Sequence, residues 1–139
     1  MSWNEAEAFC QQKNGHLASI TTGAINQYVM GGMNSKGLSQ TWIGGNDIVG
    51  EGTWKWTDGS SFGFTSWNSG EPNDSGGNED CMLYRGDGKW NDGKCSDPLN
   101  FLCSKPGAIM RGGRVIGNDI DITSKFYFVT TNLEILDSQ

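Results

Sequence analysis

Four cysteines constrain the fold of this 139-residue chain more than any other feature. They are Cys10, Cys81, Cys95 and Cys103. No two of them have the short spacing typical of a zinc site, and His16 is the only histidine, so we expect two disulfide bonds instead of metal-bound thiols. Four cysteines allow three pairings, and the spacing alone does not choose among them. Disulfides persist in oxidising compartments, which predicts a secreted or extracellular protein.

Length and composition indicate one domain. Aromatic residues make up 11% of the chain and include six tryptophans, which is enough for one packed core. Twenty-one glycines and three prolines predict many tight turns and few long helices. No apolar run is long enough to span a bilayer, and residues 1–10 lack the pattern of a secretion signal, so we expect any signal to lie outside this sequence. The net charge of -6 disfavours nucleic acid as a partner.

The first part of the chain predicts two helices. Residues 2–5, Ser-Trp-Asn-Glu, form a capping-box pattern, and apolar residues then recur at helical spacing until Asn14-Gly15. Residues 16–20 alternate like a short strand. Thr22 should begin a second helix, with Ile25, Tyr28 and Val29 on one face, and Gly31-Gly32 should end it.

Short strands and one long loop are expected in the region that follows. Residues 41–44 and 53–57 have strand patterns, and Asp58-Gly59 is a turn signal. Residues 60–79 show no periodicity and contain only isolated aromatics, which predicts a functional loop. Three more short strands are expected at residues 81–84, 89–90 and 100–103. We expect core positions for four tryptophans: Trp42, Trp54, Trp56 and Trp67.

Carboxylate and amide side chains are concentrated in and beside this loop. They occur in Glu71-Pro72-Asn73, in Asn78-Glu79-Asp80 and in Trp90-Asn91-Asp92. Such hard oxygen ligands favour Ca²⁺, which takes six to eight oxygens and can leave positions open for water or for two sugar hydroxyls. The sequence therefore predicts a calcium site that recognises a ligand. Residues 119–130 do not form an EF-hand, because Ser124 stands where that loop needs glycine and Thr130 where it needs glutamate.

In their order and spacing these motifs resemble the C-type lectin-like domain, in its short mannose-type form. The resemblance covers residues 3–106. Its parts are Trp3-Asn4-Glu5-Ala6 with Cys10, Gly15 with Leu17-Ala18, Trp42-Ile43-Gly44, Glu71-Pro72-Asn73, Glu79-Asp80-Cys81, Trp90-Asn91-Asp92 and Phe101-Leu102-Cys103. It implies an α+β fold of C-type lectin type, in which two helices flank small antiparallel sheets with a long calcium-binding loop region. It also implies the disulfides Cys10–Cys103 and Cys81–Cys95.

The resemblance further implies two calcium sites and a sugar ligand. The principal calcium would be held by Glu71, Asn73, Glu79, Asn91 and Asp92, and the first four of these would also contact the sugar hydroxyls. The auxiliary calcium would be held by Asp47, Glu51, Asp74, Glu79 and Asp80. The Glu71-Pro72 bond is expected to be cis when calcium is bound. The Glu-Pro-Asn order implies mannose, N-acetylglucosamine or fucose, carried by glycans on glycoproteins or cell surfaces, with homo-oligomerisation as a source of avidity.

The order of the elements is unusual for such a domain. The family normally has a strand rich in Phe and Tyr before the first helix, and residues 125–131 of the tail resemble that strand. We interpret the 139 residues as one circularly permuted domain. Residues 1–106 would run from the first helix to the last strand, 107–124 would form a connecting hairpin around Gly112-Gly113, and 125–139 would be the displaced strand. Gln139 would then lie within about 10 Å of Met1. The alternatives are an unrelated tail or the start of a second tandem domain.

Two other classes of function fit the sequence less well. A protein- or ice-binding module on the same scaffold is disfavoured, because a ligand residue is present at all five principal positions. An enzyme is disfavoured because the chain has one histidine and its acids are mostly assigned to calcium, which leaves no nucleophile with a base and an orienting group.

Overall fold

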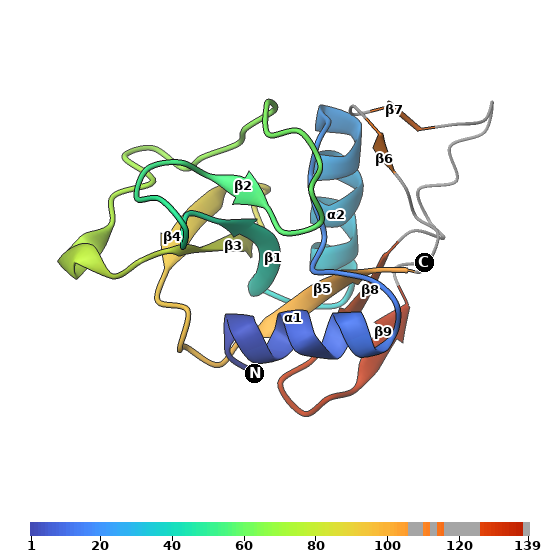
Figure 1. Ribbon diagram of the computed structural model, residues 1–139. Helices are drawn as coiled ribbons and strands as arrows, with labels where there is room; N and C mark the ends of the chain where they lie inside the picture. Colours follow the sequence, from blue (N-terminus) through green and yellow to red (C-terminus); the bar gives the residue numbers. More distant parts are fainter. Residues whose placement is uncertain (106–109, 112–113, 116–125, 138–139) are drawn as a thin grey trace.

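The computed structural model describes residues 1–105, 110–111, 114–115 and 126–137. Within these residues seven strands form one mixed sheet in the order β4-β3-β1-β5-β8-β9, with β2 paired to β1 (Figure 1). The strands are β1 Gln40–Asn46, β2 Lys55–Trp56, β3 Cys81–Arg85, β4 Trp90–Gly93, β5 Asn100–Ser104, β8 Phe126–Val129 and β9 Ile135–Asp137. All pairs are antiparallel except β1 with β5. The expectation of small antiparallel sheets is thus corrected, because this parallel pair joins both halves into one sheet.

Helix α1, Trp3–Gln12, begins as predicted. Ser2 and Glu5 form a complete capping box, which satisfies two backbone N–H groups at the start of the helix. Ala6 and Cys10 are buried one turn apart on the face that contacts the sheet. The capping pattern and the apolar spacing were therefore sufficient to place this helix.

Helix α2, Gly23–Ser35, continues past the predicted end at Gly31-Gly32. Met33 extends the buried stripe of Ile25 and Val29 by another turn. Gly32 is a packing residue, because a Cβ atom there would lie only 3.1 Å from Cε2 of Phe128 on β8. The glycine therefore permits a close contact with the sheet, and its effect on helix propensity is outweighed by the burial of Met33.

Residues 16–20 do not form the predicted strand. Leu17 makes one isolated antiparallel bridge with Cys103, and Ala18 hydrogen-bonds irregularly, donating its N–H to Leu102 and accepting from Gly44. Residues 17–20 are nevertheless all buried. Leu17 packs in the core layer on the α1 side of the sheet, whereas Ala18 and Ile20 pack in the layer on the α2 side, so the apolar character of this segment reflects burial and not strand pairing.

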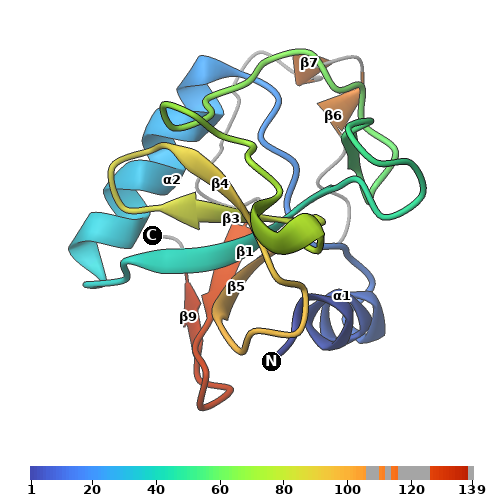
Figure 2. The same cartoon turned by 90° about the vertical axis from the view of Figure 1, so that its left-hand side faces the viewer.

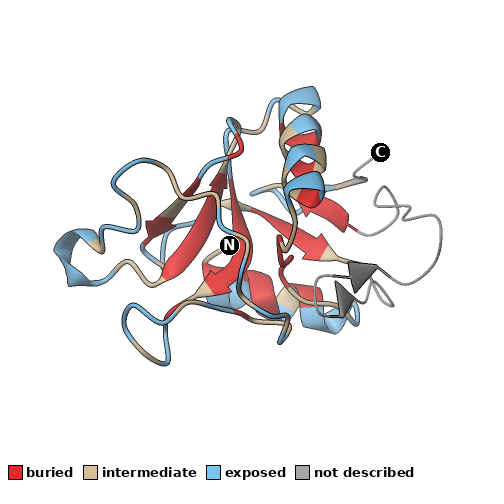
Figure 3. Ribbon diagram, turned by 90° about the horizontal axis from the view of Figure 1, so that it is seen from above, coloured by how far each residue is buried: buried red, intermediate tan, exposed pale blue. Residues whose placement is uncertain are grey.

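The core consists of two layers, one on each face of the sheet (Figures 1 and 3). Side chains alternate along each strand, so that Trp42, Leu83 and Phe101 face α1 while Ile43, Tyr84 and Leu102 face α2. Both predicted disulfides are present. Cys10–Cys103 joins α1 to β5, and Cys81–Cys95 joins β3 to the segment after β4.

The tail contributes strand β8, which pairs with β5. Phe101 lies opposite Val129, and Cys103 lies opposite Tyr127. Strand β9 then runs antiparallel to β8, from Ile135 opposite Val129 to Asp137 opposite Tyr127. It therefore runs away from the start of β5, where Leu99 N donates to the Met1 carbonyl. The described tail therefore does not lead into α1. Gln139 lies outside the described residues, so the permuted order and its domain boundaries stay a prediction.

A separate two-stranded hairpin is formed by β6 Met110–Arg111 and β7 Arg114–Val115. This confirms the hairpin expected around Gly112-Gly113, although the turn itself lies outside the described residues. The helices among the described residues lack the length and apolar character of a membrane span.

Candidate metal and ligand site

The predicted long loop is attached to the sheet by its aromatic residues. The ring of Phe62 lies 5.2 Å from that of Trp56, and the rings of Phe64 and Trp67 lie 5.9 and 5.8 Å from that of Trp90. These residues stand as isolated aromatics in the sequence, and the structure shows that they hold the loop on the core. Trp42 and Trp56 are buried in the core, as predicted. Trp54 and Trp67 are only partly buried and pack against the core from its edge, so the prediction holds in part for these two.

Strand β4 links the loop to the site. Trp90 is buried and donates from its indole nitrogen to Oδ1 of Asn26 at 3.1 Å. Its backbone accepts from Asn68 at 2.9 Å, and the carbonyl of Asn68 in turn accepts from Glu71 N. Beyond this point the loop projects from the body of the molecule as an exposed lobe with the short 3₁₀ helix η1, Ser75–Gly77 (Figures 1 and 3), and Figure 2 looks onto this lobe from the front.

Asp92 organises the first group of predicted ligands. Its side chain is buried, and its two oxygens accept from the backbone N–H groups of Asn73 at 3.1 Å and Asp74 at 2.6 Å. The N–H of Ser75 is shared between Oδ1 of Asn73 at 3.1 Å and Oε1 of Glu79 at 2.9 Å. The Glu71-Pro72 bond is cis. The loop is therefore folded around one carboxylate by its own hydrogen bonds.

Glu71 and Asn91 complete this group. Burial raises the pKa of Glu71, and the negative charge of Asp92, a hydrogen bond with Asp92 and the charge of Glu79 raise it further, against the opposing effect of Arg85. These effects show that the three carboxylates lie within interaction range. Asn91 is next to Asp92 on β4, and its Oδ1 is buried without a hydrogen-bond partner. A cation would relieve the repulsion among the carboxylates, and the unpaired oxygen of Asn91 is a further potential ligand, so these residue types fit calcium.

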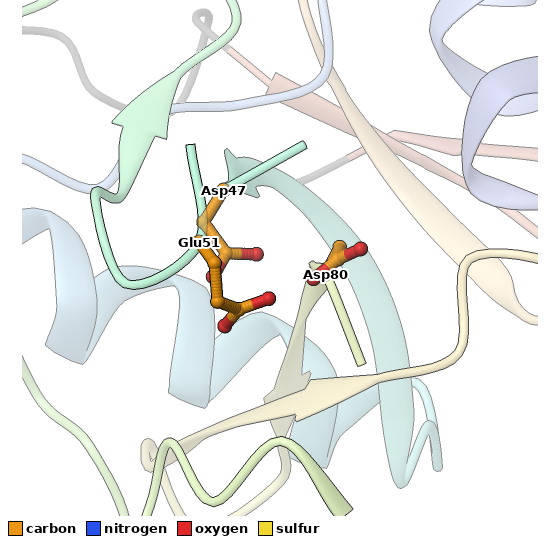
Figure 4. A group of neighbouring side chains, drawn as sticks. All are labelled: Asp47, Glu51 and Asp80. Atoms are coloured by element: carbon orange, nitrogen blue, oxygen red, sulfur yellow. The ribbon is translucent and has the colours of Figure 1, made fainter. Parts of the chain in front are cut away.

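A second group, Asp47, Glu51 and Asp80, forms the acidic cluster in Figure 4. One oxygen from each carboxylate lies within 4.8 Å of the others. A bulge in the pairing of β1 with β3 brings Asp47 beside Asp80, and Asp47 N donates to the Asp80 carbonyl at 3.0 Å. Gly52 N donates to Oδ2 of Asp47 at 2.9 Å, which closes the loop that carries Glu51.

The electrostatics of this cluster also fit a cation. A hydrogen bond with Asp47 raises the pKa of Glu51 to about 7, with further contributions from burial, from Asp80 and from the charge of Asp74. Burial raises the pKa of Asp80, as does a hydrogen bond with Asp47. Oδ1 of Asp47 and Oδ1 of Asp80 are buried without a hydrogen-bond partner. Three crowded acids with two unpaired oxygens are the environment in which a divalent ion relieves repulsion.

The remaining two residues of the predicted auxiliary set are placed differently. Asp74 is near enough for its charge to act on Glu51 and Asp80, but its Oδ1 accepts from Glu79 N at 2.9 Å. Its backbone has φ of 45°, a left-handed conformation that aspartate tolerates better than most residues. Glu79 faces Ser75, and no described contact joins its side chain to the acidic cluster.

Arg85 lies near the site and was not predicted from the sequence. Its charge acts on Glu71, and its guanidinium contacts Asp87 at 3.0 Å. Strand alternation would have found it, because Arg85 is two residues after Leu83, which pairs with Asn91.

Comparison with known proteins gives concordant matches. The family model for the Lectin C-type domain matches residues 1–105. A C-type lectin mannose-binding isoform of Oxyuranus scutellatus is 43% identical over 111 residues, which cover 73% of this chain and 69% of that protein. C-type lectin domain family 10 member A of Homo sapiens is 41% identical over 110 residues, which cover 74% of this chain and 33% of that protein. The chain thus spans about a third of the human relative.

A solved structure agrees with these matches. The carbohydrate-recognition domain of the human scavenger receptor C-type lectin superposes with a TM-score of 0.68 at 34% identity. The superposition covers 74% of this chain and 81% of that one.

Proposed function

The chain belongs to the family of C-type lectin domains, and on that premise we propose that it binds mannose-type sugars through a bound calcium ion. It is not an enzyme, because this family and the relatives that match consist of carbohydrate-binding or receptor proteins. The principal calcium would be held by Glu71, Asn73, Glu79, Asn91 and Asp92.

One observation carries the proposal: the loop that carries Glu71, Asn73 and Glu79 lies against the buried carboxylate of Asp92, close enough for the charge of Asp92 to act on Glu71. Asp92 accepts two backbone hydrogen bonds from the loop that carries the other three residues, so the loop and β4 have a fixed relation. Oδ1 of Asn91, on the adjacent position of β4, is the buried oxygen left without a partner. The oxygen ligands would therefore come from two elements, the loop and β4, which hydrogen bonds to Asp92 already hold together.

The calcium ion would supply open coordination positions for two neighbouring sugar hydroxyls. The side chains around the ion would supply directed hydrogen bonds to these hydroxyls. An asparagine that binds the ion through its oxygen can donate its N–H₂ to a hydroxyl, and a glutamate can accept from one. Asn73 and Asn91 would therefore meet hydroxyl oxygens, while Glu71 and Glu79 would accept hydroxyl protons. Binding requires both kinds of contact at once.

The order of acid and amide in Glu71-Pro72-Asn73 supports selectivity for equatorial vicinal hydroxyls. Mannose, N-acetylglucosamine and a suitably presented fucose offer such a pair. The ligands would be glycans on glycoproteins or cell surfaces, outside the cell, where the disulfides Cys10–Cys103 and Cys81–Cys95 are stable. Because single calcium sites bind monosaccharides weakly, assembly of several copies would raise the avidity.

A second, auxiliary calcium is proposed at Asp47, Glu51 and Asp80, with Asp74 nearby. The two unpaired buried oxygens in this cluster support it. The predicted bridging role of Glu79 is retained as part of this proposal, and it would require the Glu79 side chain to leave Ser75 N.

A binding assay tests the proposed function. The purified chain is applied to immobilised mannose, N-acetylglucosamine, fucose and galactose glycans in calcium, and again in excess EDTA. We expect binding to the first three in calcium, release by EDTA and competition by free mannose. Retention of mannose binding in EDTA would contradict the calcium-dependent mechanism. Absence of binding to any glycan in calcium would favour a protein- or ice-binding role for the scaffold.

A further inference from the structure

Two buried tryptophans of the core differ in how their indole N–H groups are satisfied. Among the described residues, Nε1 of Trp56 has no hydrogen-bond partner, whereas Nε1 of Trp90 donates to Oδ1 of Asn26 on α2 at 3.1 Å. The rings of Trp56, Phe64 and Trp67 lie 5.5, 5.9 and 5.8 Å from that of Trp90. Apolar burial is non-directional, so the hydrogen bond to Asn26 is the contact that best defines how the indole of Trp90 is turned.

The side-chain amide of Asn26 also joins α2 to the turn before β4. Its Nδ2 donates to the Gly88 carbonyl at 3.0 Å, and the same carbonyl accepts from Oγ of Ser66 at 2.9 Å. An indole N–H can only donate and a carbonyl can only accept, so both partners define the same orientation of the amide. A Cβ atom on Gly88 would lie 3.1 Å from Sδ of Met30 and 3.4 Å from Nδ2 of Asn26, which shows that this turn packs closely against α2.

The backbone of Trp90 holds the two elements that carry the proposed calcium ligands. Its N–H donates to the Ser66 carbonyl at 2.8 Å, and its carbonyl accepts from Asn68 N at 2.9 Å. The carbonyl of Asn68 accepts from Glu71 N at 2.9 Å, which leads to the first proposed ligand of the loop. On β4, the side chains of Trp90 and Asp92 share one face and are separated by roughly 7 Å along the strand. Trp90 is therefore the residue at which the loop and β4 are joined.

Asn26 acts on the site through Trp90 and not as a ligand. Both groups of its side-chain amide are used by Trp90 and Gly88, and its backbone carbonyl accepts from the hydroxyl of Tyr84 on β3. Removal of the amide would leave the buried N–H of Trp90 without an acceptor, and the cost of such an unpaired group favours a shift of the ring. A shift of Trp90 would change the relation between β4 and the loop.

We propose that Asn26 is a positioning residue for the principal calcium site. Through the indole of Trp90 it sets the relation between β4, which carries Asn91 and Asp92, and the loop, which carries the other three proposed ligands. The inference rests on the proposed function, because the calcium ion and the sugar are themselves proposals. Its geometric part can nevertheless be tested without either.

Amide hydrogen exchange of the calcium-free protein, measured by NMR in EDTA, tests the geometric part. The N–H groups of Asn73 and Asp74 report on the contact between the loop and β4, because both donate to the carboxylate of Asp92. In Asn26→Ala we expect both to exchange at least about fivefold faster, the effect of about one lost hydrogen bond. Val29→Ala is the matched control. It loses core packing on the same helix without removing a hydrogen bond, and should leave both rates unchanged.

Calcium titration of mannose binding tests the functional part. The readout is the calcium concentration that gives half-maximal binding to immobilised mannose, at a temperature where circular dichroism shows every variant to be folded. Asn26→Ala should raise this concentration by about tenfold, as the loss of a residue that orients metal ligands does, and Val29→Ala should change it by less than about twofold. Trp90→Phe removes the indole donor and should act like Asn26→Ala. Adding Asn26→Ala to Trp90→Phe should then change the concentration by less than about twofold, because the contact is already absent.

Each outcome bears on the inference. Unchanged exchange rates or an unchanged calcium requirement in Asn26→Ala would overturn it, and so would an equal effect of Val29→Ala, which would indicate a general loss of stability. A full additional effect of Asn26→Ala in the Trp90→Phe chain would show that Asn26 does not act through the indole. If Asn26→Ala does not fold, Asn26→Asp keeps the acceptor for the indole and should hold the calcium requirement within about threefold, whereas a tenfold rise would overturn the inference. Failure of the unmodified chain to bind mannose in calcium would overturn the proposed function, while the exchange rates would still decide whether Asn26 positions the loop.

Discussion

The two acidic groups of this protein differ in how their oxygens are satisfied. Around Asp92 the polypeptide itself supplies the partners, because backbone N–H groups of residues 73–75 donate to Asp92, Asn73 and Glu79. In the cluster of Asp47, Glu51 and Asp80, two buried carboxylate oxygens have no partner and the acids raise one another's pKa. Backbone hydrogen bonds hold the first group in its geometry, whereas the second group has unpaired oxygens that a cation could bind.

This difference assigns separate roles to the two groups. The group around Asp92 holds its geometry through hydrogen bonds, as a site that must present oxygens to an ion and a sugar together requires. The acidic cluster gains more from an ion than it can gain from the chain, so its ion would mainly affect stability. Substitutions should therefore separate sugar binding from calcium-dependent stability.

The largest effect is expected from Asp92→Ala. The substitution leaves two backbone N–H groups unpaired and removes a predicted ligand, so we expect sugar affinity to fall on the order of 100-fold or more. The unfolding free energy should fall by about 2–4 kcal/mol, because hydrogen bonds to a charged group are lost. Glycan binding and chemical denaturation measure the two effects. Asp97→Ala, which removes an exposed carboxylate outside both groups, is the control and should change neither. Full sugar binding by Asp92→Ala would remove Asp92 from the site.

The next effect concerns sugar selectivity. The double substitution Glu71→Gln with Asn73→Asp keeps the net charge but exchanges the positions of acid and amide. Mannose affinity should fall and galactose affinity should rise, each by about tenfold, since one or two directed hydrogen bonds are reversed. Competition of the two monosaccharides against one immobilised glycan measures the change. An unaltered preference would show that these two residues do not contact the hydroxyls.

Asp80→Asn should separate the acidic cluster from sugar binding. An ion at 100 times its dissociation constant adds about 2.7 kcal/mol of stability, which is a rise in melting temperature on the order of 10 °C. The substitution relieves repulsion, so the melting temperature in EDTA should increase, while the rise caused by calcium should shrink by half or more. Sugar binding in saturating calcium should persist. Asp97→Asn provides the matched control, and a calcium-induced rise equal to that of the unmodified chain would argue against an ion in the cluster.

The smallest effect is the pH dependence of the ion-free protein. The pKa of Glu51 is raised to about 7 in the folded state, above its ordinary value of 4.5, so the protonated carboxyl stabilises the fold. That contribution is complete below pH 4.5 and is lost as the pH rises through 7. In EDTA the melting temperature should fall between pH 5.5 and pH 8 more in the unmodified chain than in Glu51→Gln. Because Glu51 is exposed, the difference should be small, and identical profiles would contradict the coupling.

Much of this architecture was predictable because it depends on local or pairwise chemistry. The capping box of α1 and the short apolar runs of β3 and β8 indicate those elements directly. The C-type lectin resemblance supplied both disulfide pairings and the cis bond at Pro72. The predicted end of α2 was wrong because Gly32 lies inside the helix and allows close packing against Phe128, a tertiary contact that helix propensity does not take into account.

The remaining differences arise from contacts between distant segments. The strand predicted at residues 16–20 does not form because this segment is buried in both core layers without regular pairing. Within the site, the motifs named the acids but not their hydrogen bonds. The hydrogen bonds from residues 73 and 74 to Asp92 depend on the path of a loop held by Phe62, Phe64 and Trp67.

A crystal structure grown in calcium and soaked with methyl α-mannoside tests the central claim most directly. We expect one ion bound by the oxygens of Glu71, Asn73, Glu79, Asn91 and Asp92, with two neighbouring sugar hydroxyls completing its coordination. We expect a second ion in the cluster of Asp47, Glu51 and Asp80, without contact to the sugar. A sugar bound away from the Asp92 group, or one that coordinates the ion of the acidic cluster, would contradict the account.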